Sequence, residues 1–426
     1  MLPDSQLADL HGGVPPEFGE ARFIARQPIL DSAQNLYGYE LLFRSGADIG
    51  FSDASGERAA QSTLDLSLLL GAESLTEGHR AFINFTRSTL CSGIVQALPR
   101  ELVVLELLED VPADEEIVRQ CRRLKLAGYT IALDDIVSVD DRPALLELAD
   151  IIKVDFLLTG ERQQRALAHR FARGSVRMLA EKVETHEQFH AAKRMGYTLF
   201  QGYFFCRPET LRAQDLPSTQ LGHLAILRKA HERELDIQGL AQVIRQEPSL
   251  VYRLLRYLNS AAWGVYPVTS VVQALNLLGD DEIRKWLSMA AAISLAGPRS
   301  QELIRMALMR ARFCELIAEK MQAPTHDFFF TGLFSFLEAI MERPLAQIIE
   351  LVPISQVCRE ALQGSANLPG TALRLAKEFE CARWETIPEL CSVLGCTERE
   401  AWRRQLEAQS WARLVLKLDV TQPTKA

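Results

Sequence analysis

Acidic and amide side chains end one apolar, strand-like run after another through the first half of this 426-residue chain. The residues at these ends are Glu40, Asn84, Glu106, Asp134, Asp135, Asp155, Glu181 and Gln201. Helix-length intervals separate most of the runs, as is typical of parallel strands joined by crossover helices. Because the carboxyl ends of parallel strands meet at one rim of a barrel, we expect these side chains to gather in a single site.

Two strand-like runs open this region and differ from the later ones. Residues 23–30 and 36–43 are separated only by the short turn at 31–35, which predicts an antiparallel hairpin. The later runs alternate with helix-like stretches at 59–70, 115–126, 142–148 and 161–173. A further helix follows Glu184, with a capping box from Thr185 and Gln188 and a stop at Gly196. The first half therefore predicts a TIM-like α/β barrel whose first strand is antiparallel.

The pattern changes after residue 208 from strand-like runs to helical spacing. Leu240, Val243 and Ile244 begin the new period, and helices are expected at 272–278, 282–295, 303–321, 328–341, 345–351, 375–380, 387–394 and 398–417. We therefore expect a flexible arm at 1–20, a barrel at 21–208, a linker at 209–221, an all-α domain at 222–415 and a tail at 416–426.

Composition and charge exclude several classes of protein. The net charge of -8 disfavours nucleic acid as a partner, because binding its backbone requires a basic face, whereas a local pocket for one phosphorylated ligand remains allowed. No apolar stretch reaches membrane-spanning length, and the N-terminus lacks the pattern of a secretory signal. We therefore expect a cytoplasmic protein that does not bind membranes. The eight cysteines include no Cys-x-x-Cys pair, so free thiols are expected.

Five carboxylates and one amide at a single rim would repel one another strongly. The six are Glu40, Asn84, Glu106, Asp134, Asp135 and Glu181. Either most of the acids are protonated, or divalent cations lie among them, and oxygen-only ligation favours magnesium, manganese or calcium. An aspartate that bridges two ions would create a two-metal site for phosphoryl hydrolysis, with Lys153 and Arg44 close to the phosphate. The alternative is that these acids are solvated strand ends on unrelated loops. That explanation is favoured for any single acid, but it is disfavoured for a whole series of acids in this order.

Residues 23–208 resemble the EAL domain, a barrel-shaped phosphodiesterase that linearises cyclic di-GMP. The matching segments are Gln27-Pro28-Ile29, Glu40-Leu41-Leu42-Phe43-Arg44, Ile83-Asn84-Phe85-Thr86, Leu105-Glu106-Leu107-Leu108-Glu109, Asp134-Asp135, Lys153-Val154-Asp155, Ala180-Glu181-Lys182-Val183-Glu184 and the run from Gln201 to Pro208. The resemblance implies that the six rim residues bind two Mg²⁺ or Mn²⁺ ions. It implies catalytic roles for Lys153, Asp155, Glu181 and Gln201, substrate binding by Gln27 and Arg44, and loop support by Glu109 and Glu184.

Several segments depart from the EAL pattern. The signature Glu-Ala-Leu reads Glu40-Leu41-Leu42, and the Trp that usually follows the arginine is replaced by Ser45. The Asp-Asp-Phe-Gly loop continues here with Ile136, and Lys182 stands in place of a glycine. These changes spare the metal ligands and alter the surrounding loops. A catalytically inactive cyclic di-GMP receptor or scaffold is therefore the alternative to an active phosphodiesterase.

Residues 221–411 resemble an HDOD domain, a helical relative of the HD metal-dependent phosphohydrolases. The segments that carry the resemblance are 240–244, 248–262, 271–279 and 283–287. Where an HD enzyme has His-Asp, this chain has Ser335-Phe336, and the nearby His326-Asp327 stands at the wrong register. The resemblance implies a non-catalytic module with an unknown protein partner, and EAL domains commonly form homodimers.

One motif suggests a different chemistry. His186-Glu187-Gln188-Phe189-His190 matches the His-Glu-x-x-His pattern of zinc proteases. No third ligand is evident nearby, and the capping box explains the segment as an ordinary helix start. We therefore do not expect a peptidase.

Overall fold

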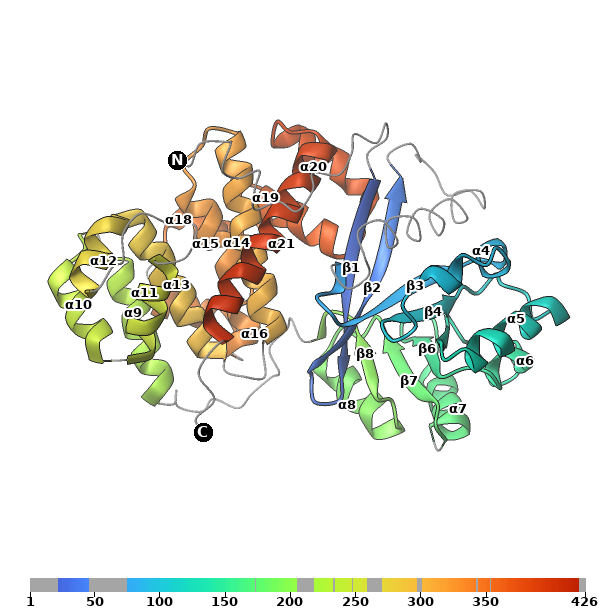
Figure 1. Ribbon diagram of the computed structural model, residues 1–426. Coiled ribbons are helices and arrows are strands. Elements are labelled where there is room, and N and C mark those ends of the chain that lie inside the picture. The colour runs from blue at the N-terminus through green and yellow to red at the C-terminus, as the bar shows by residue number, and fades with distance from the viewer. Residues whose placement is uncertain are drawn as a thin grey trace.

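The computed structural model describes residues 22–45, 75–172, 174–204, 218–232, 234–246, 248–258, 270–296, 301–341, 344–352 and 354–420. The expected arm at 1–20, the expected helix at 59–70 and most of the expected linker lie outside these residues. The described chain forms a barrel and a helical domain that pack side by side (Figure 1).

Eight strands form a closed barrel in the order of the chain. They are β1 (Arg22–Asp31), β2 (Leu36–Ser45), β3 (Arg80–Phe85), β4 (Val103–Leu107), β5 (Thr130–Leu133), β6 (Ile151–Asp155), β7 (Arg177–Glu181) and β8 (Leu199–Gln201). Strand β1 is antiparallel to both β2 and β8, whereas the other neighbouring pairs are parallel. The predicted barrel with an antiparallel first strand is therefore confirmed.

Short helices connect the parallel strands on the outside of the barrel. They are α4 (Arg87–Cys91), η1 (Ile94–Ala97), α5 (Glu115–Leu126), α6 (Pro143–Leu146), α7 (Glu161–Phe171) and α8 (His186–Met195). The predicted capping box of α8 is confirmed, because Thr185 and Gln188 each bond to the other's backbone N–H. Gly196 ends this helix at a φ of 109°, in the left-handed region that favours glycine. The His-Glu-x-x-His match is thus the capped start of a helix.

Two layers of side chains fill the barrel interior. The lower layer is apolar and consists of Ile29, Phe82, Val104, Ala132, Ile151, Leu179 and Leu199. Because side chains alternate along a strand, the residues two positions further on face the same interior, one layer nearer the carboxyl ends. That second layer is polar and consists of Asn84, Glu106, Asp134, Lys153, Glu181 and Gln201. The two-residue alternation of side chains along each strand therefore places the predicted polar side chains at one rim of the barrel.

The helical domain extends from α9 to α21. Its elements are α9 (Ser218–Ala230), α10 (Ile237–Gln246), α11 (Pro248–Leu258), α12 (Val271–Leu278), α13 (Asp280–Ala296), α14 (Gln301–Lys320), α15 (His326–Phe334), α16 (Leu337–Met341), α17 (Leu345–Leu351), α18 (Gln356–Leu362), α19 (Leu368–Glu380), η4 (Trp384–Thr386), α20 (Ile387–Val393) and α21 (Glu398–Val420). The expected domain boundaries at 221 and 415 stay predictions. Among the described helices, none is long and apolar enough to cross a membrane.

One predicted helix is interrupted. The segment 328–341 is divided between α15 and α16 at Ser335, whose hydroxyl donates to the Gly332 carbonyl oxygen over 2.7 Å. A side chain that bonds to a nearby carbonyl competes with the helical hydrogen bonds. Gly332 also permits a close approach to α14, because a Cβ there would lie 2.4 Å from the Arg310 carbonyl oxygen.

The outer wall of the barrel and the helical domain share one hydrophobic core. Outward-facing Leu30, Tyr39 and Leu41 of the first hairpin belong to the same buried cluster as Ile304 and Ala307 of α14. Helix α19 also contacts β1 (Figure 1). The helical domain therefore covers the sector of the wall that contains the antiparallel hairpin.

Candidate metal centre

A buried ammonium group lies at the centre of the polar rim. The Nζ atom of Lys153 lies 2.6 Å from Glu181 Oε1, 3.0 Å from Asp134 Oδ1 and 3.5 Å from Glu40 Oε2, and it also pairs with Glu106. The Lys153 side chain is only 1% exposed. We call these four carboxylates and Lys153 the rim cluster. Its acids come from β2, β4, β7 and the end of β5, so closure of the barrel brings them together.

The charges of the rim cluster shift one another's pKa values. Burial alone would lower the pKa of Lys153, but the surrounding carboxylates raise it well above its ordinary value. Burial and the neighbouring Glu40 raise the pKa of Glu106 well above its usual range. Burial raises the pKa of Glu181 to about 8, against the opposing effect of Lys153. One ammonium therefore does not neutralise four carboxylates, and the cluster favours additional positive charge.

Several oxygens of the rim are buried without a hydrogen-bond partner among the described residues. They are Asn84 Oδ1, Glu106 Oε2, Asp135 Oδ1 and Gln201 Oε1. Oxygens of Glu40, Glu106 and Glu181 lie within 4.8 Å of one another. A second group with the same spacing consists of Glu109, Asp134 and Asp135. Unpartnered carboxylate and amide oxygens in two adjoining groups fit hard divalent cations such as Mg²⁺ and Mn²⁺.

The backbone leaves regular strand geometry where two successive aspartates must reach the rim. Strand β5 ends at Leu133, and the Asp134 N–H donates to the Leu107 carbonyl oxygen over 3.0 Å. Asp135 has a φ of 48°, in the left-handed region that Asp tolerates better than most residues. The chain therefore leaves regular strand geometry at this rim. It also brings Glu109 beside the aspartates, whereas sequence analysis gave this glutamate only loop support.

Asp155 is bound differently from the acids of the rim cluster. Its Oδ1 atom accepts from the backbone N–H groups of Leu157, at 2.6 Å, and Leu158, at 3.0 Å. Its other oxygen pairs with the ammonium of Lys182. Lys182 has a φ of 50°, so the position that is glycine in the EAL pattern has the left-handed backbone that suits glycine. A lysine there accepts backbone strain and places a cation on Asp155.

A pair of glutamines closes the rim at the antiparallel strand. The Gln201 Nε2 atom donates to Gln27 Oε1 and to Glu40 Oε2, each over 2.7 Å. The bond to Glu40 fixes one oxygen of an expected metal ligand.

Glu184 is exposed, and its N–H donates to Gln188 Oε1 over 2.8 Å at the start of α8. The Arg44 side chain lies outside the described part of the structure.

Sequence reasoning missed the way in which Lys153 relieves the repulsion at the rim. The sequence places Lys153 near the phosphate and the attacking water, but it does not show that the Lys153 ammonium offsets the charge of the carboxylates. The available signal was the position of Lys153 two residues after Ile151, which places it on the interior face. The pairing of Lys182 with Asp155 was also missed, because it requires the left-handed backbone at residue 182.

A buried arginine occupies the region where an HD enzyme has its metal-binding His-Asp. The Arg310 guanidinium donates to Ser335 Oγ over 3.0 Å and lies 3.8 Å from the centroid of the Phe336 ring. It also pairs with Glu380 on α19, with Nη2 2.5 Å from Oε2. Among the described residues, no metal-ligating group of three lies in the helical domain. A cation already fills this region, so the arrangement disfavours metal-dependent chemistry there.

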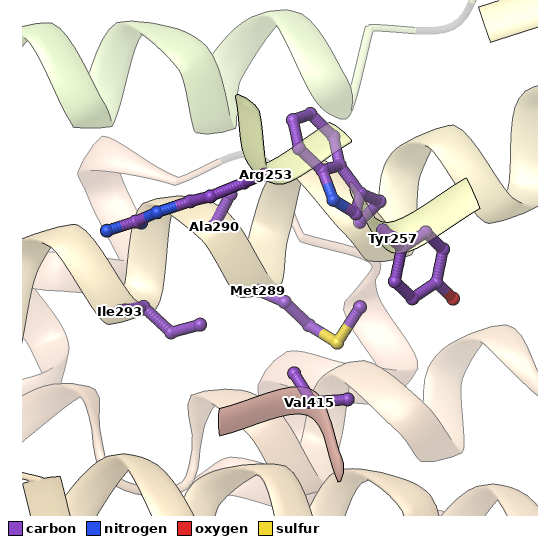
Figure 2. Close-up of a pocket in the computed structure, with 7 residues that line it drawn as sticks. Arg253, Tyr257, Met289, Ala290, Ile293 and Val415 are labelled. Carbon is purple, nitrogen blue, oxygen red and sulfur yellow. The ribbon is translucent and has the colours of Figure 1, made fainter. Parts of the chain in front are cut away.

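A pocket with a mixed lining lies in the described part of the helical domain (Figure 2). Its lining residues are Arg253, Tyr257, Trp286, Met289, Ala290, Ile293 and Val415. Arg253 donates to Ser294 Oγ over 3.2 Å. This lining contains no carboxylate, so it offers none of the ligands that a hard cation requires.

The fold and the rim cluster define a barrel of the EAL class joined to an HD-related helical domain. Family models match residues 51–208 as an EAL domain and residues 216–342 as an HDOD domain. The chain is 32% identical over 400 residues to uncharacterized protein YuxH of Bacillus subtilis, which covers 91% of this chain and 97% of that protein. It is also 32% identical over 403 residues to cyclic di-GMP phosphodiesterase CdgJ of Vibrio cholerae, and this match covers 93% of this chain and 93% of that protein.

The chain therefore belongs to the family of two-domain proteins in which an EAL domain precedes an HDOD domain. A solved structure with a similar barrel is a standalone EAL protein from Vibrio cholerae O395 in its c-di-GMP bound form. It is 23% identical and covers 44% of this chain and 92% of its own, with a TM-score of 0.36.

Proposed function

We propose that this protein is a cyclic di-GMP phosphodiesterase that hydrolyses its substrate to the linear dinucleotide at the rim cluster. The observation that carries the proposal is the convergence of four carboxylates on Lys153, beside buried oxygens that lack a partner among the described residues. Membership in a family that includes a curated cyclic di-GMP phosphodiesterase supports the choice of substrate.

The residues that would hold two Mg²⁺ or Mn²⁺ ions are Glu40, Asn84, Glu106, Asp134, Asp135 and Glu181. When bound, such ions supply Lewis-acid activation of water and of a phosphoryl oxygen. Lys153 stays protonated at neutral pH because its pKa is raised, so it acts as a hydrogen-bond donor and not as a base. We assign it the orientation of the attacking water and the neutralisation of charge on the phosphate.

Other side chains orient the reacting groups. Gln201 fixes the Glu40 carboxylate through its amide and shapes the site, while Gln27 supports the same amide and lies at the substrate side. Asp155 orders the loop after β6 through its two backbone hydrogen bonds. Arg44 is proposed to bind a phosphate, and Glu184 to support the loop before α8. For the helical domain we propose a non-catalytic role in binding a protein partner.

The test is a cleavage assay with cyclic di-GMP across a series of Mg²⁺ and Mn²⁺ concentrations. Wild-type protein should cleave the nucleotide only with metal, and Glu106→Gln should lose roughly 100-fold or more of the activity, because it removes a buried ligand charge. Glu116→Gln is the matched control, since Glu116 pairs with Arg87 on the barrel surface. No cleavage by wild-type protein, or full activity in Glu106→Gln, would reject the proposal.

A second candidate function is a receptor that binds cyclic di-GMP without cleaving it. The ion pair between Lys182 and Asp155 favours it, because a cation there holds an expected catalytic carboxylate. Calorimetry in parallel with the cleavage assay separates the two functions. Binding without turnover, together with turnover gained in Lys182→Gly, would identify Lys182 as the residue that silences the site.

A further inference from the structure

Two consecutive residues of β2 face different parts of the molecule. Glu40 points into the barrel, where its carboxylate meets Lys153 and Gln201. Tyr39 points outward, because neighbouring side chains on a strand lie on opposite faces. The Tyr39 side chain is completely buried, although it lies on the outer wall of the barrel. What covers it is the helical domain.

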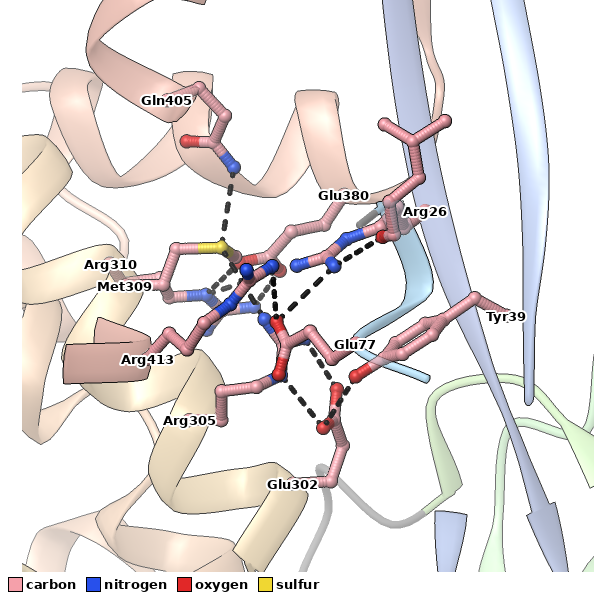
Figure 3. A network of polar contacts seen from close by, with 11 residues as sticks. Arg26, Tyr39, Glu77, Glu302, Arg305, Met309, Arg310, Glu380, Gln405 and Arg413 are labelled. Carbon is pink, nitrogen blue, oxygen red and sulfur yellow. Dashed lines mark hydrogen bonds and ion pairs between the residues drawn. The ribbon is translucent and has the colours of Figure 1, made fainter. Parts of the chain in front are cut away.

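Helix α14 holds Tyr39 through a pair of charged residues (Figure 3). The Tyr39 hydroxyl donates to Glu302 Oε2 over 3.1 Å, and Arg305 bonds to both oxygens of Glu302, at 2.5 and 2.8 Å. The Arg305 guanidinium carbon lies 5.5 Å from the centroid of the Tyr39 ring. Arg26 of β1 lies over the same ring at 4.9 Å. Tyr39 is thus held by cations from both domains.

Glu77 of the barrel joins the two domains at the same place (Figure 3). Its Oε1 atom lies 3.3 Å from Nη1 of Arg26 and 3.5 Å from Nη2 of Arg413 on α21. Buried polar networks add little net stability, because desolvation offsets their attraction, but they can fix one arrangement of the packed elements. An apolar contact would allow β2 to shift against α14, whereas these directional bonds hold it in register.

The helical domain also contacts the segment that follows β8, the strand whose Gln201 bonds to Glu40. Tyr203 follows Gln201 by two residues, and its hydroxyl lies 2.8 Å from Cys381 Sγ, just after α19. Glu40 receives its amide hydrogen bond from Gln201. The helical domain therefore contacts both the strand that carries Glu40 and the segment that orients its carboxylate.

We infer that the helical domain sets the position of the Glu40 metal ligand through Tyr39, with Glu302 and Arg305 as positioning residues. This inference rests on the proposed metal site. A shift of α14 moves the Tyr39 hydroxyl, and the backbone of β2 passes that movement to Glu40 on its opposite face. A protein partner that binds the helical domain then regulates metal affinity in the barrel without touching the rim cluster.

The test measures Mg²⁺ affinity by calorimetry in the wild-type full chain and in four variants of it. Tyr39→Phe and Glu302→Gln should each weaken Mg²⁺ binding roughly 3- to 10-fold, the range expected when one hydrogen bond that orients a ligand is lost. Tyr197→Phe is the matched control, because this equally buried hydroxyl donates only within the barrel, to the Gln164 carbonyl oxygen at 3.1 Å. It should keep wild-type affinity. The double variant Tyr39→Phe with Glu302→Gln should be no weaker than the worse single variant, because both variants act on the same contact between Tyr39 and α14.

A second readout follows the coupling in the reverse direction. All five tryptophans of the chain lie at or beyond residue 263, so tryptophan fluorescence reports on the helical half alone. Bound Mg²⁺ should raise the fluorescence-detected unfolding midpoint of wild-type protein, and Glu302→Gln should at least halve that increase. Unchanged affinity in Glu302→Gln, an equal loss in Tyr197→Phe, or absence of Mg²⁺ binding by wild-type protein would overturn the coupling. Tight Mg²⁺ binding without cleavage of cyclic di-GMP would instead reject only the phosphodiesterase.

Discussion

At the scale of single residues, the rim cluster depends on one cation in a fixed place. Lys153 pairs with carboxylates on β2, β4 and β7 and just after β5, and it is shielded from water, so its charge acts on every carboxylate around it. A mobile solvent cation would offset the same charge only at an entropic cost. The ammonium therefore keeps the site assembled in the absence of metal, while the remaining negative charge leaves a strong attraction for divalent ions.

Replacing the central lysine should expose the repulsion that it offsets. In metal-free buffer at pH 8, Lys153→Met should lower the free energy of unfolding by about 3 kcal/mol, the cost of leaving buried charges unpaired. The deficit should shrink toward pH 5, because Glu106 and Glu181, whose pKa values are raised, are then protonated. Urea unfolding of wild-type protein and Lys153→Met at pH 8 and pH 5 measures this difference in the free energy of unfolding.

The matched control for that variant is Lys125→Met. Lys125 pairs with Asp150 at 2.9 Å on the barrel surface, and both side chains are more than a third exposed. Solvent screens such a pair, so its loss should cost less than about 1 kcal/mol at either pH. An equal deficit for Lys153→Met at both pH values would contradict the assignment of repulsion as the cause.

A histidine in the helical domain should make stability depend on pH. Burial, with His326 and Arg284 nearby, lowers the pKa of His231 to about 4. Its unfolded pKa is near the ordinary 6.5, so the unfolded state binds the proton first as pH falls. The stability from His231 is complete above pH 6.5 and declines toward pH 4, by at most about 2 kcal/mol between pH 6.5 and pH 5.

The measurement for His231 is urea unfolding followed by tryptophan fluorescence at pH 7.5 and pH 5. His231→Gln removes the titrating group and retains a partner for the Ser288 hydroxyl, which lies 3.1 Å from Nε2. This variant should lose less stability on acidification than wild-type protein. His169→Gln, at an exposed position of α7, should behave as wild-type protein does. A pH dependence that persists unchanged in His231→Gln would assign it to other groups.

At the scale of elements, periodicity gave the strands and most of the helices correctly. The two-residue period placed Asn84, Glu106 and Glu181 on the interior face, because only one register buries the apolar partners of these side chains. The short α18 and the break at Ser335 were not predicted. Both depend on contacts between distant segments, such as the Arg310 bond to Ser335, which local sequence does not encode.

The parts of the site that escaped prediction have the same origin. Lys182 bonds to Asp155 only because its backbone is left-handed, and the conformation of one residue is set by the loop packed around it. Tyr39 read as an ordinary strand residue, since its partners Glu302 and Arg305 lie far along the chain. Local periodicity therefore predicts on which face of its strand a side chain lies. It does not predict which residues from distant segments contact that side chain.

The loop after β8 should tolerate no side chain at Gly202. This glycine has a φ of 141°, and a Cβ there would lie 2.2 Å from the Val183 carbonyl oxygen. That carbonyl accepts the Phe204 N–H at 3.1 Å, and the Val183 N–H donates to the Gln201 carbonyl oxygen at 3.0 Å. Gly202→Ala must break this pairing between the ends of β7 and β8.

Gly202→Ala should therefore cost roughly 2 kcal/mol or more of stability and displace Gln201 from Glu40. Thermal unfolding measures the first effect, and Mg²⁺ calorimetry measures the second. Gly174→Ala is the control, since a Cβ there makes only an ordinary 3.8 Å contact with the Phe171 carbonyl oxygen. Wild-type stability in Gly202→Ala would show that the loop relaxes around the new methyl group.

At the scale of the whole molecule, the two domains behave as parts of one core. The outer faces of β1 and β2 pack directly on the helical domain, in a single buried cluster that extends from Leu30 of the hairpin to Ile304 of α14. Unfolding either domain alone would expose the apolar face of the other, together with Tyr39 and the paired charges around it. The interface therefore couples the stability of the barrel to that of the helices.

Such coupling predicts that both domains unfold in one transition. Tryptophan fluorescence follows the helical half, because the chain has no tryptophan before residue 263, and labelling of the buried Cys121 thiol, resolved by mass spectrometry, follows the barrel. The two urea midpoints should coincide in wild-type protein, since a large shared core makes the partly unfolded states costly. Glu302→Gln, which removes the negative charge paired with the buried Arg305 guanidinium, should separate them, with Cys121 becoming reactive at a different urea concentration. Two separate transitions already present in wild-type protein would show that the shared core is too small to join the domains, and Glu40 would then keep its place without help from α14.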